Sequence, residues 1–144
     1  MKEAVQLAQP HDTILINPGI YRENDITINK SLVIIGQQQP ILDAGFKKGI
    51  FSVMAENVLI AGLTMRNVEE SFAKNYAAVR VRGGGHVTIR DNTILNTYYG
   101  VYLEQTDSCA VLNNTIQGQA KQETTSGNAI MCGAPGLSPL RAIK

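Results

Sequence analysis

Several features that define common protein classes are scarce in this chain. It has 144 residues, a formal net charge of +1 and only 17% charged residues, so charge gives no reason to expect binding to nucleic acid or to an anionic membrane. No apolar run approaches the roughly 20 residues that a membrane-spanning helix needs. The length predicts at most one domain.

The start of the chain and its cysteines exclude two further classes. Met1–Ala4 lead into no apolar core of the kind found in signal peptides, which predicts either a cytoplasmic protein or the loss of the true amino terminus. The two cysteines, Cys109 and Cys132, have no metal-ligand spacing and provide no disulfide framework.

What the chain does contain is a repeat of 22 residues. Short runs with apolar residues two apart recur at this constant step, which is typical of strands with one buried face. The first copy is Ala78–Val81, Val87–Ile89 and Asn92–Ile94, and the second is Gly100–Leu103, Cys109–Val111 and Asn114–Ile116. Three strands per step, joined by turns, describe one coil of a parallel β-helix, a solenoid whose coils bury their apolar faces against one another. Cys109 takes the place of Val87, so we expect a small buried hydrophobe there.

Coils on either side extend the pattern. Strands are expected at Asp12–Ile16, Ile26–Ile28, Leu32–Ile34 and Ile41–Gly45. Gly49 and Val58 match Ala78 and Val87 at a step of 29, and Ala129 matches Gly100 at the same step. The extra residues fall in two polar loops, Glu69–Tyr76 and Gln117–Ser126. Solenoid insertions lie on one side, often the working side.

The two ends depart from the repeat. Residues 2–9 are expected to form a short helical turn, with Val5 and either Leu7 or Ala8 facing inward as part of a cap. Residues 131–144 lose the alternation and contain Pro135 and Pro139. One restored base before the codon of Met131 allows a reading frame that rebuilds a strand, a corner and the next strand. We therefore divide the chain into a β-helix at 1–130 and an off-pattern tail at 131–144, a frameshift product by hypothesis.

Stacked coils make specific side chains neighbours. Asn92 and Asn114 occupy one turn position in successive coils, where their side chains can form a hydrogen-bonded ladder; the alternative is two unrelated turn asparagines. Glu104 lies over Arg82, which predicts a cross-strand ion pair. Paired carboxylates for acid–base catalysis do not recur, since Asp91 aligns with Asn113 and the other acidic residues are dispersed. This pattern predicts a protein that is not an enzyme.

Candidate binding residues are few. Copper(I) prefers thiolate, thioether and imidazole ligands, and the spacing brings no such set together. Met65 aligns with Ile94 in the core, which leaves His86, Met54 and Met131 as weak metal candidates; the alternative for His86 is an ordinary polar loop residue. Alternation points Tyr102 outward, and Tyr98 falls on the same side, so this pair could face a sugar or be plain surface.

The order of motifs resembles known families. Asp12–Ile14 followed by Pro18–Tyr21 is similar to the opening coil of pectin-lyase-like, right-handed, single-stranded parallel β-helices. Over about residues 1–130 the chain also resembles the NosD family. Members of this family are periplasmic accessory proteins for the maturation of the copper enzyme nitrous oxide reductase. The stretches that carry this second resemblance are Lys30–Gly36, Leu42–Gly45, Ile60–Asn67, Tyr99–Leu103 and Gly127–Ile130.

This resemblance implies an all-β, right-handed parallel β-helix of about five coils. It also implies a periplasmic location and copper as a cofactor. The partners that it implies are ABC transporter subunits and a copper enzyme or chaperone. The chain departs from the family in its missing signal peptide, its few coils and its tail, so it resembles an amino-terminal fragment. The alternatives are a carbohydrate-binding or carbohydrate-processing β-helix and an inactive gene fragment.

Overall fold

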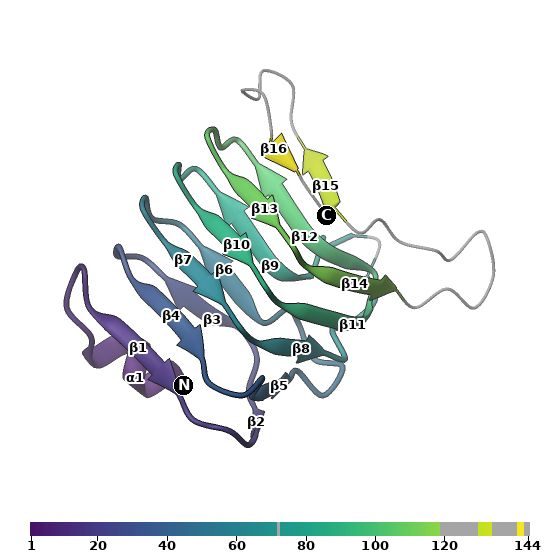
Figure 1. The fold of residues 1–144 in the computed structure, drawn as a ribbon. Helices are drawn as coiled ribbons and strands as arrows, with labels where there is room; N and C mark the ends of the chain where they lie inside the picture. Colours follow the sequence, from purple (N-terminus) through teal and green to yellow (C-terminus); the bar gives the residue numbers. More distant parts are fainter. Residues whose placement is uncertain (72, 119–129, 134–140, 143–144) are drawn as a thin grey trace.

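The chain forms an all-β parallel solenoid of about five turns (Figure 1). The computed structural model describes residues 1–71, 73–118, 130–133 and 141–142, the last two ranges by their backbone except for Ile130. Three parallel sheets, named A, B and C below, surround one interior. This confirms the predicted fold class, whereas the right-handed winding stays a prediction.

Each coil contributes one strand to each sheet. Sheet A contains β1 (Thr13–Ile16), β4 (Val33–Gly36), β7 (Leu59–Ala61), β10 (Thr88–Arg90), β13 (Ala110–Leu112) and β16 (Arg141–Ala142). Sheet B contains β2 (Ile20–Arg22), β5 (Ile41–Asp43), β8 (Thr64–Arg66), β11 (Thr93–Thr97) and β14 (Thr115–Gly118). Sheet C contains β3 (Ile26–Ile28), β6 (Phe51–Val53), β9 (Ala77–Arg82), β12 (Tyr99–Glu104) and β15 (Ile130–Gly133).

The core is built from columns of apolar side chains that point inward from successive coils. Ile34, Ile60 and Ile89 stack in sheet A and are all fully buried. Met65 and Ile94 stack in sheet B and are also fully buried, which confirms the core position expected for Met65. Each such side chain contributes roughly 1.5–3 kcal/mol by leaving water. The solenoid is therefore stabilised by contacts between coils rather than within them.

The step of 22 residues is confirmed in all three sheets, where Val79 pairs with Val101, Ile89 with Val111 and Ile94 with Ile116. The step of 29 holds where Leu59 pairs with Thr88. In sheet C the step of 29 holds where Val101 pairs with Ile130, as expected from Gly100 and Ala129. It is wrong between β6 and β9, because Phe51 pairs with Val79 and not with the residue after it. From Val53 to Leu59 the chain advances one residue less than between their partners Val81 and Thr88, so the register shifts by one residue at this corner.

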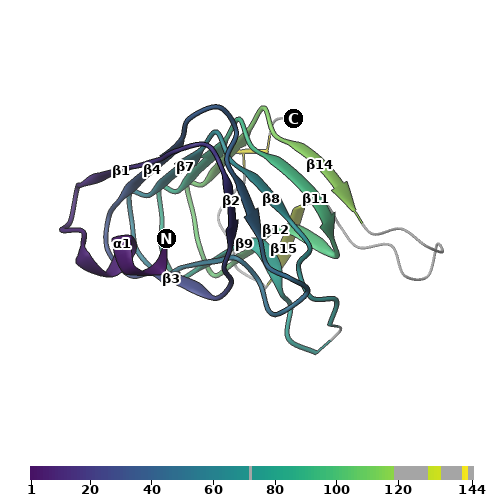
Figure 2. The same cartoon turned by 90° about the horizontal axis from the view of Figure 1, so that it is seen from below.

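The amino-terminal end carries a short helix, α1 (Lys2–Leu7), which lies across the end of the solenoid beside β3 (Figure 2). Val5 is 2% exposed and belongs to the core, as expected. Of the two alternatives for the second inward residue, Ala8 packs against the core and Leu7 is 76% exposed. Leu7 as an inward residue was therefore wrong.

Part of the tail continues the solenoid. β15 runs through Gly133, which pairs with Glu104, so the strand pattern passes beyond the expected boundary at residue 130. Residues 119–129, with most of the loop expected at Gln117–Ser126, lie outside the described residues, as do residues 134–140 and 143–144. The division at residue 130 and the frameshift stay predictions.

Candidate functional site

Asn92 and Asn114 meet at the corner between sheets A and B. Asn92 is 2% exposed, and its side-chain nitrogen donates to Asn114 Oδ1 at 3.1 Å. The same nitrogen donates to the carbonyl of Ile60 at 3.1 Å, and Asn92 Oδ1 accepts the N–H of Leu63 at 3.0 Å. Asn114 donates in turn to the carbonyl of Ile89 at 2.9 Å. The ladder satisfies buried polar groups of the turns, which is a structural role.

The metal candidates come from three different segments of the solenoid. Met54 is 57% exposed on the corner between β6 and β7, and His86 is exposed on the corner between β9 and β10. The backbone of Met131 lies opposite Tyr102 in β15. Cys109 is buried as expected, with its sulfur 3.2 Å from Thr106 Oγ1. Within the described ranges no three His, Cys, Asp or Glu side chains are grouped so as to hold a metal ion.

The outer face of sheet C gathers aromatic and charged side chains. Tyr102 lies opposite Arg80, whose Cζ atom is 5.9 Å from the centre of the tyrosine ring. The ring of Tyr99 packs edge-on against Tyr102 at 5.1 Å, and Tyr98 packs edge-on against Tyr99 at 4.7 Å. We call Arg80, Tyr98, Tyr99, Tyr102 and Glu104 the tyrosine cluster.

The exposure expected for Tyr102 is wrong. Val101 and Leu103 enter the core while Tyr102 stays outside it, as alternation predicts, yet Tyr102 is only 7% exposed. Arg80 from the neighbouring strand β9 and Tyr99 from the same strand pack against its ring. Tyr98 and Tyr99 are half-buried and remain accessible. Burial raises the pKa of Tyr99, and the nearby phenols of Tyr98 and Tyr102 raise it further.

Glu104 pairs chiefly with Arg80. Glu104 lies opposite Arg82 in the sheet, as predicted. The ion pair between them is long, with Arg82 Nε 3.9 Å from Glu104 Oε2, and the side chain of Arg82 is 61% exposed. Arg80 NH2 donates to the same oxygen at 2.9 Å. Arg80 Nε is buried and has no hydrogen-bond partner among the described residues. The residue Arg80 also lines a cavity of about 80 Å³, together with Asp25, Ser52 and Tyr76.

A second polar ladder was missed by the sequence reasoning. Asn67 donates to both carboxylate oxygens of Asp43 at 3.1 Å, and Asn96 donates to Asn67 Oδ1 at 3.2 Å. Both asparagines adopt the left-handed backbone conformation, with φ of 61° and 54°. Asn67 and Asn96 are separated by the same 29 positions as the flanking strands, so this spacing was the available signal. Asp43 could not be found this way because it is not an asparagine.

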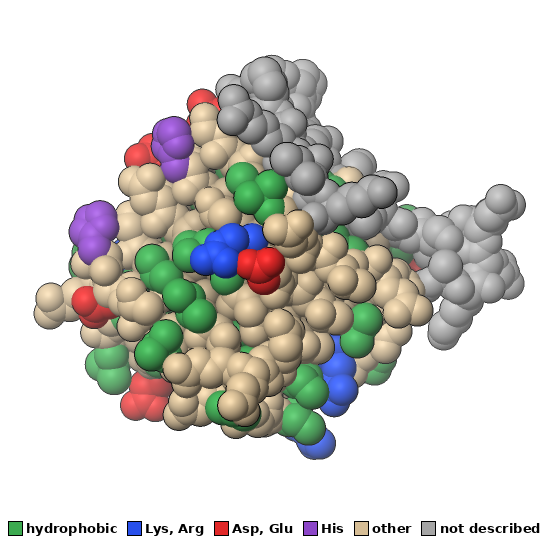
Figure 3. Space-filling view, in the orientation of Figure 1, with side chains coloured by type: hydrophobic (Ala, Val, Ile, Leu, Met, Phe, Trp, Pro, Cys, Tyr) green, Lys and Arg blue, Asp and Glu red, His purple; other side chains and the backbone are tan. Residues whose placement is uncertain are grey.

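Charged groups are scattered over the surface. On the described part of the face in Figure 3, acidic and basic side chains lie singly or in pairs and form no large patch of one sign. Among the described residues, no helix is long and apolar enough to cross a membrane.

The coils and their period agree with a comparison to protein families. A family model described as "Periplasmic copper-binding protein (NosD)" matches residues 7–132. The chain belongs to the NosD family. The family match confirms the resemblance, and it covers nearly all of the described solenoid. Members of the family are described as periplasmic and copper-binding, and the family is generally one of non-catalytic accessory proteins. Searches of curated proteins and of solved structures found no match.

Proposed function

We propose that this chain is a non-enzymatic, periplasmic accessory protein that assists maturation of the copper site of nitrous oxide reductase. Its partners are ABC transporter subunits and the copper enzyme or a copper chaperone. The observation that carries the proposal is the family match over residues 7–132, which spans every coil from β1 to β15. Copper enters this proposal as cargo, and no copper ligand is assigned to the chain.

The tyrosine cluster supports a role in docking a partner. Tyrosine and arginine are enriched among the side chains that contribute most to protein–protein binding. Arg80 and Glu104 hold each other at 2.9 Å, so little side-chain freedom remains to be lost when a partner binds. The cluster sits on strands paired on both sides, because β9 and β12 are interior strands of sheet C.

Deletion of the gene tests the proposal. We expect the reductase protein to be made in normal amount but to be short of copper, as measured by metal analysis of the purified enzyme. The gene for the chain should restore copper when supplied in trans. Supply of the Tyr98→Ala variant tests the tyrosine cluster, with Asn29→Ala as a folded, exposed control. Normal copper content in the deletion strain would contradict the proposed function.

A second candidate function is carbohydrate binding, which the half-buried rings of Tyr98 and Tyr99, packed edge-on against each other, favour because aromatic rings offer flat faces to sugars. Titration with neutral and anionic oligosaccharides, followed by tyrosine fluorescence, tests it. Saturable binding that Tyr98→Ala abolishes, in a protein whose deletion leaves the reductase loaded, would favour this candidate. Absence of both effects would favour an inactive gene fragment.

A further inference from the structure

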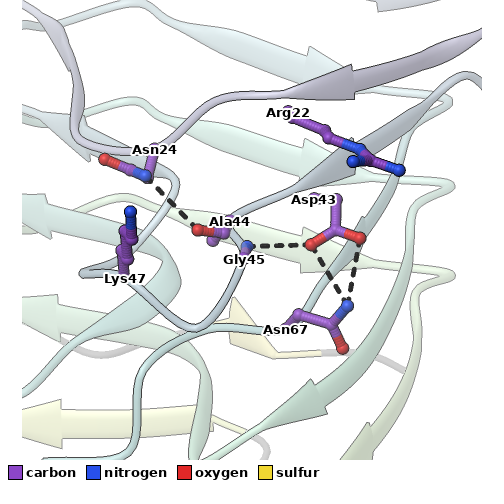
Figure 4. Close-up of a pocket in the computed structure, with 7 residues that line it drawn as sticks. All are labelled: Arg22, Asn24, Asp43, Ala44, Gly45, Lys47 and Asn67. Carbon is purple, nitrogen blue, oxygen red and sulfur yellow. Dashed lines mark hydrogen bonds between the residues drawn. The ribbon is translucent and has the colours of Figure 1, made fainter.

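An open pocket of about 370 Å³ lies where the chain leaves β2 and β5 (Figure 4). Its lining comes from three successive coils. Arg22 ends β2 and Asn24 follows it, Asp43 ends β5 and Gly45 and Lys47 lie in the turn after it, and Asn67 follows β8. Its size falls in the range of pockets that hold small molecules, roughly 300–1,000 Å³. It lies on the second polar ladder and shares no residue with the tyrosine cluster.

The one carboxylate on the lining of the pocket, that of Asp43, already accepts hydrogen bonds from other residues of the chain. Asp43 Oδ1 accepts the N–H of Gly45 at 2.8 Å, and Oδ2 accepts Arg66 Nε at 3.0 Å. Asn67 donates to both oxygens. Burial alone would raise the pKa of Asp43, but these hydrogen bonds outweigh it and lower the pKa. Asp43 is therefore an ionised, internally paired group, and its charge is balanced by Arg66 rather than left to attract a cation.

Two cationic side chains in the pocket have no such partner. Neither the guanidinium of Arg22 nor the ammonium of Lys47 has a hydrogen bond or an ion pair with any described residue, and both side chains are exposed. In Figure 4 they lie on either side of the turn at Ala44 and Gly45, with the guanidinium of Arg22 on the side of Asp43 and Lys47 on the side of Asn24. The space beside Gly45, between them, is open, since a Cβ atom there would meet nothing within 4 Å.

The charge balance decides which ligand suits the pocket. With Asp43 paired to Arg66, the unpaired charges on the lining are both positive. A metal cation would be repelled, whereas an oxyanion can accept charge-assisted hydrogen bonds from arginine and lysine. The side-chain nitrogen of Asn24 makes one hydrogen bond, to the carbonyl of Ala44 at 3.3 Å, and its second N–H is a further donor.

We propose that this pocket binds a small molecule that carries a carboxylate or phosphate group, with the anionic group attracted by the unpaired positive charges of Arg22 and Lys47. The geometry of this pocket carries the inference, which does not depend on the role in copper maturation. Asn24 contributes a neutral donor, and Asp43 acts as a positioning residue because it fixes Asn67 and the turn at Gly45.

Isothermal titration of the 144-residue chain tests the proposal. The probes are inorganic phosphate, glucuronate and, as a neutral match for glucuronate, glucose. We expect saturable binding of phosphate, glucuronate or both, no binding of glucose, and weaker binding at high salt. Binding of phosphate alone or glucuronate alone identifies the class of anion, and binding of both shows that the charge itself is recognised.

Variants locate the binding. Arg22→Gln and Lys47→Gln should each weaken binding about tenfold, since each removes one charge-assisted hydrogen bond. Arg82→Gln, which makes the same change in charge at an exposed position of sheet C, should leave the affinity unchanged. Lys47 makes no side-chain contact that folding requires, so its variant remains informative if Arg22→Gln does not fold. Equal binding of glucose, unchanged affinity in Lys47→Gln, or no binding of either anion would overturn the proposal.

Discussion

The side-chain nitrogen of Asn92 donates a hydrogen bond to the side-chain oxygen of Asn114 at 3.1 Å, although 22 residues separate the two in the chain. The backbone N–H of Asn92 donates to the same oxygen at 3.0 Å. This pair joins two coils at a corner where the backbone is not in a sheet. It shows that polar contacts, as well as the apolar columns, keep the coils in register.

Asn92→Ala should lower the free energy of unfolding by about 3 kcal/mol, because it removes the buried hydrogen bonds of this side chain to the N–H of Leu63 and the carbonyl of Ile60. Asn114→Ala should cost less, about 1 kcal/mol, since Asn114 is only half-buried. Urea denaturation measures both. Asn29→Ala, at an exposed position with no hydrogen bond among the described residues, is the control. A cost for Asn92→Ala no larger than that of the control would show that the ladder does not stabilise the fold.

The ion pairs of Glu104 can be separated by double-mutant cycles. Arg80→Gln with Glu104→Gln should show a coupling energy of about 1 kcal/mol, because both side chains are largely buried and lie 2.9 Å apart. Arg82→Gln with Glu104→Gln should show a coupling of only about 0.2 kcal/mol, because Arg82 is exposed and 3.9 Å away. Thermal or urea denaturation of the five variants supplies the energies. The reverse order would restore Arg82 as the main partner.

Gly84→Ala should be strongly destabilising, by about 3 kcal/mol or more, because an added Cβ would lie 2.3 Å from the carbonyl oxygen of Ala55 on the preceding coil. On the other side, Thr106 donates a hydrogen bond to the carbonyl of Gly84, so the backbone cannot simply move away. Gly83→Ala is the matched control. Its added Cβ meets nothing, and we expect a cost of about 1 kcal/mol from its φ of 74° alone. Similar melting temperatures for the two variants would be inconsistent with this packing.

Asp43 should make the fold less stable in acid. Its pKa is lowered from 3.8, so the unfolded chain binds a proton more readily than the folded chain does. The stabilisation is complete above pH values near 3.8 and is lost as pH falls through the lower folded pKa. Glu23, whose pKa is lowered from 4.5, acts in the same direction.

Asp43→Asn should therefore remove part of the decline in stability between about pH 5 and pH 2. The protonation of Glu23 should still cause a further part of this decline in the variant. Urea midpoints measured across this range check the prediction. A pH profile for Asp43→Asn identical to that of the original chain would mean that the hydrogen bonds from Gly45, Arg66 and Asn67 do not favour the ionised carboxylate.

Much of the architecture was predictable because the information is local. Apolar residues two apart identify a strand and its buried face, and the step from Ile89 to Val111 identifies the coil. The contact between Asn92 and Asn114 follows from the same step, since residues at equivalent positions in stacked coils become neighbours. The family could also be recognised from motifs such as Tyr99–Leu103, because these lie within single coils.

The candidate site was less predictable because it depends on how far side chains reach between coils. The aligned pair was Glu104 and Arg82, but the less exposed Arg80, two residues earlier on the same strand, lies nearer the carboxylate of Glu104 and is the better partner. Tyr102 points outward as alternation requires, and only packing against Tyr99 and Arg80 buries it.

The sequence alone determined the period, the strands and the inward residues, because alternation and repeat spacing are properties of neighbouring positions in the chain. The tertiary structure decided the register of Phe51 with Val79, since that depends on the lengths of two distant corners. It also decided that Asp43 is paired while Arg22 and Lys47 are not, because those partners come from three coils and meet only once the coils are stacked.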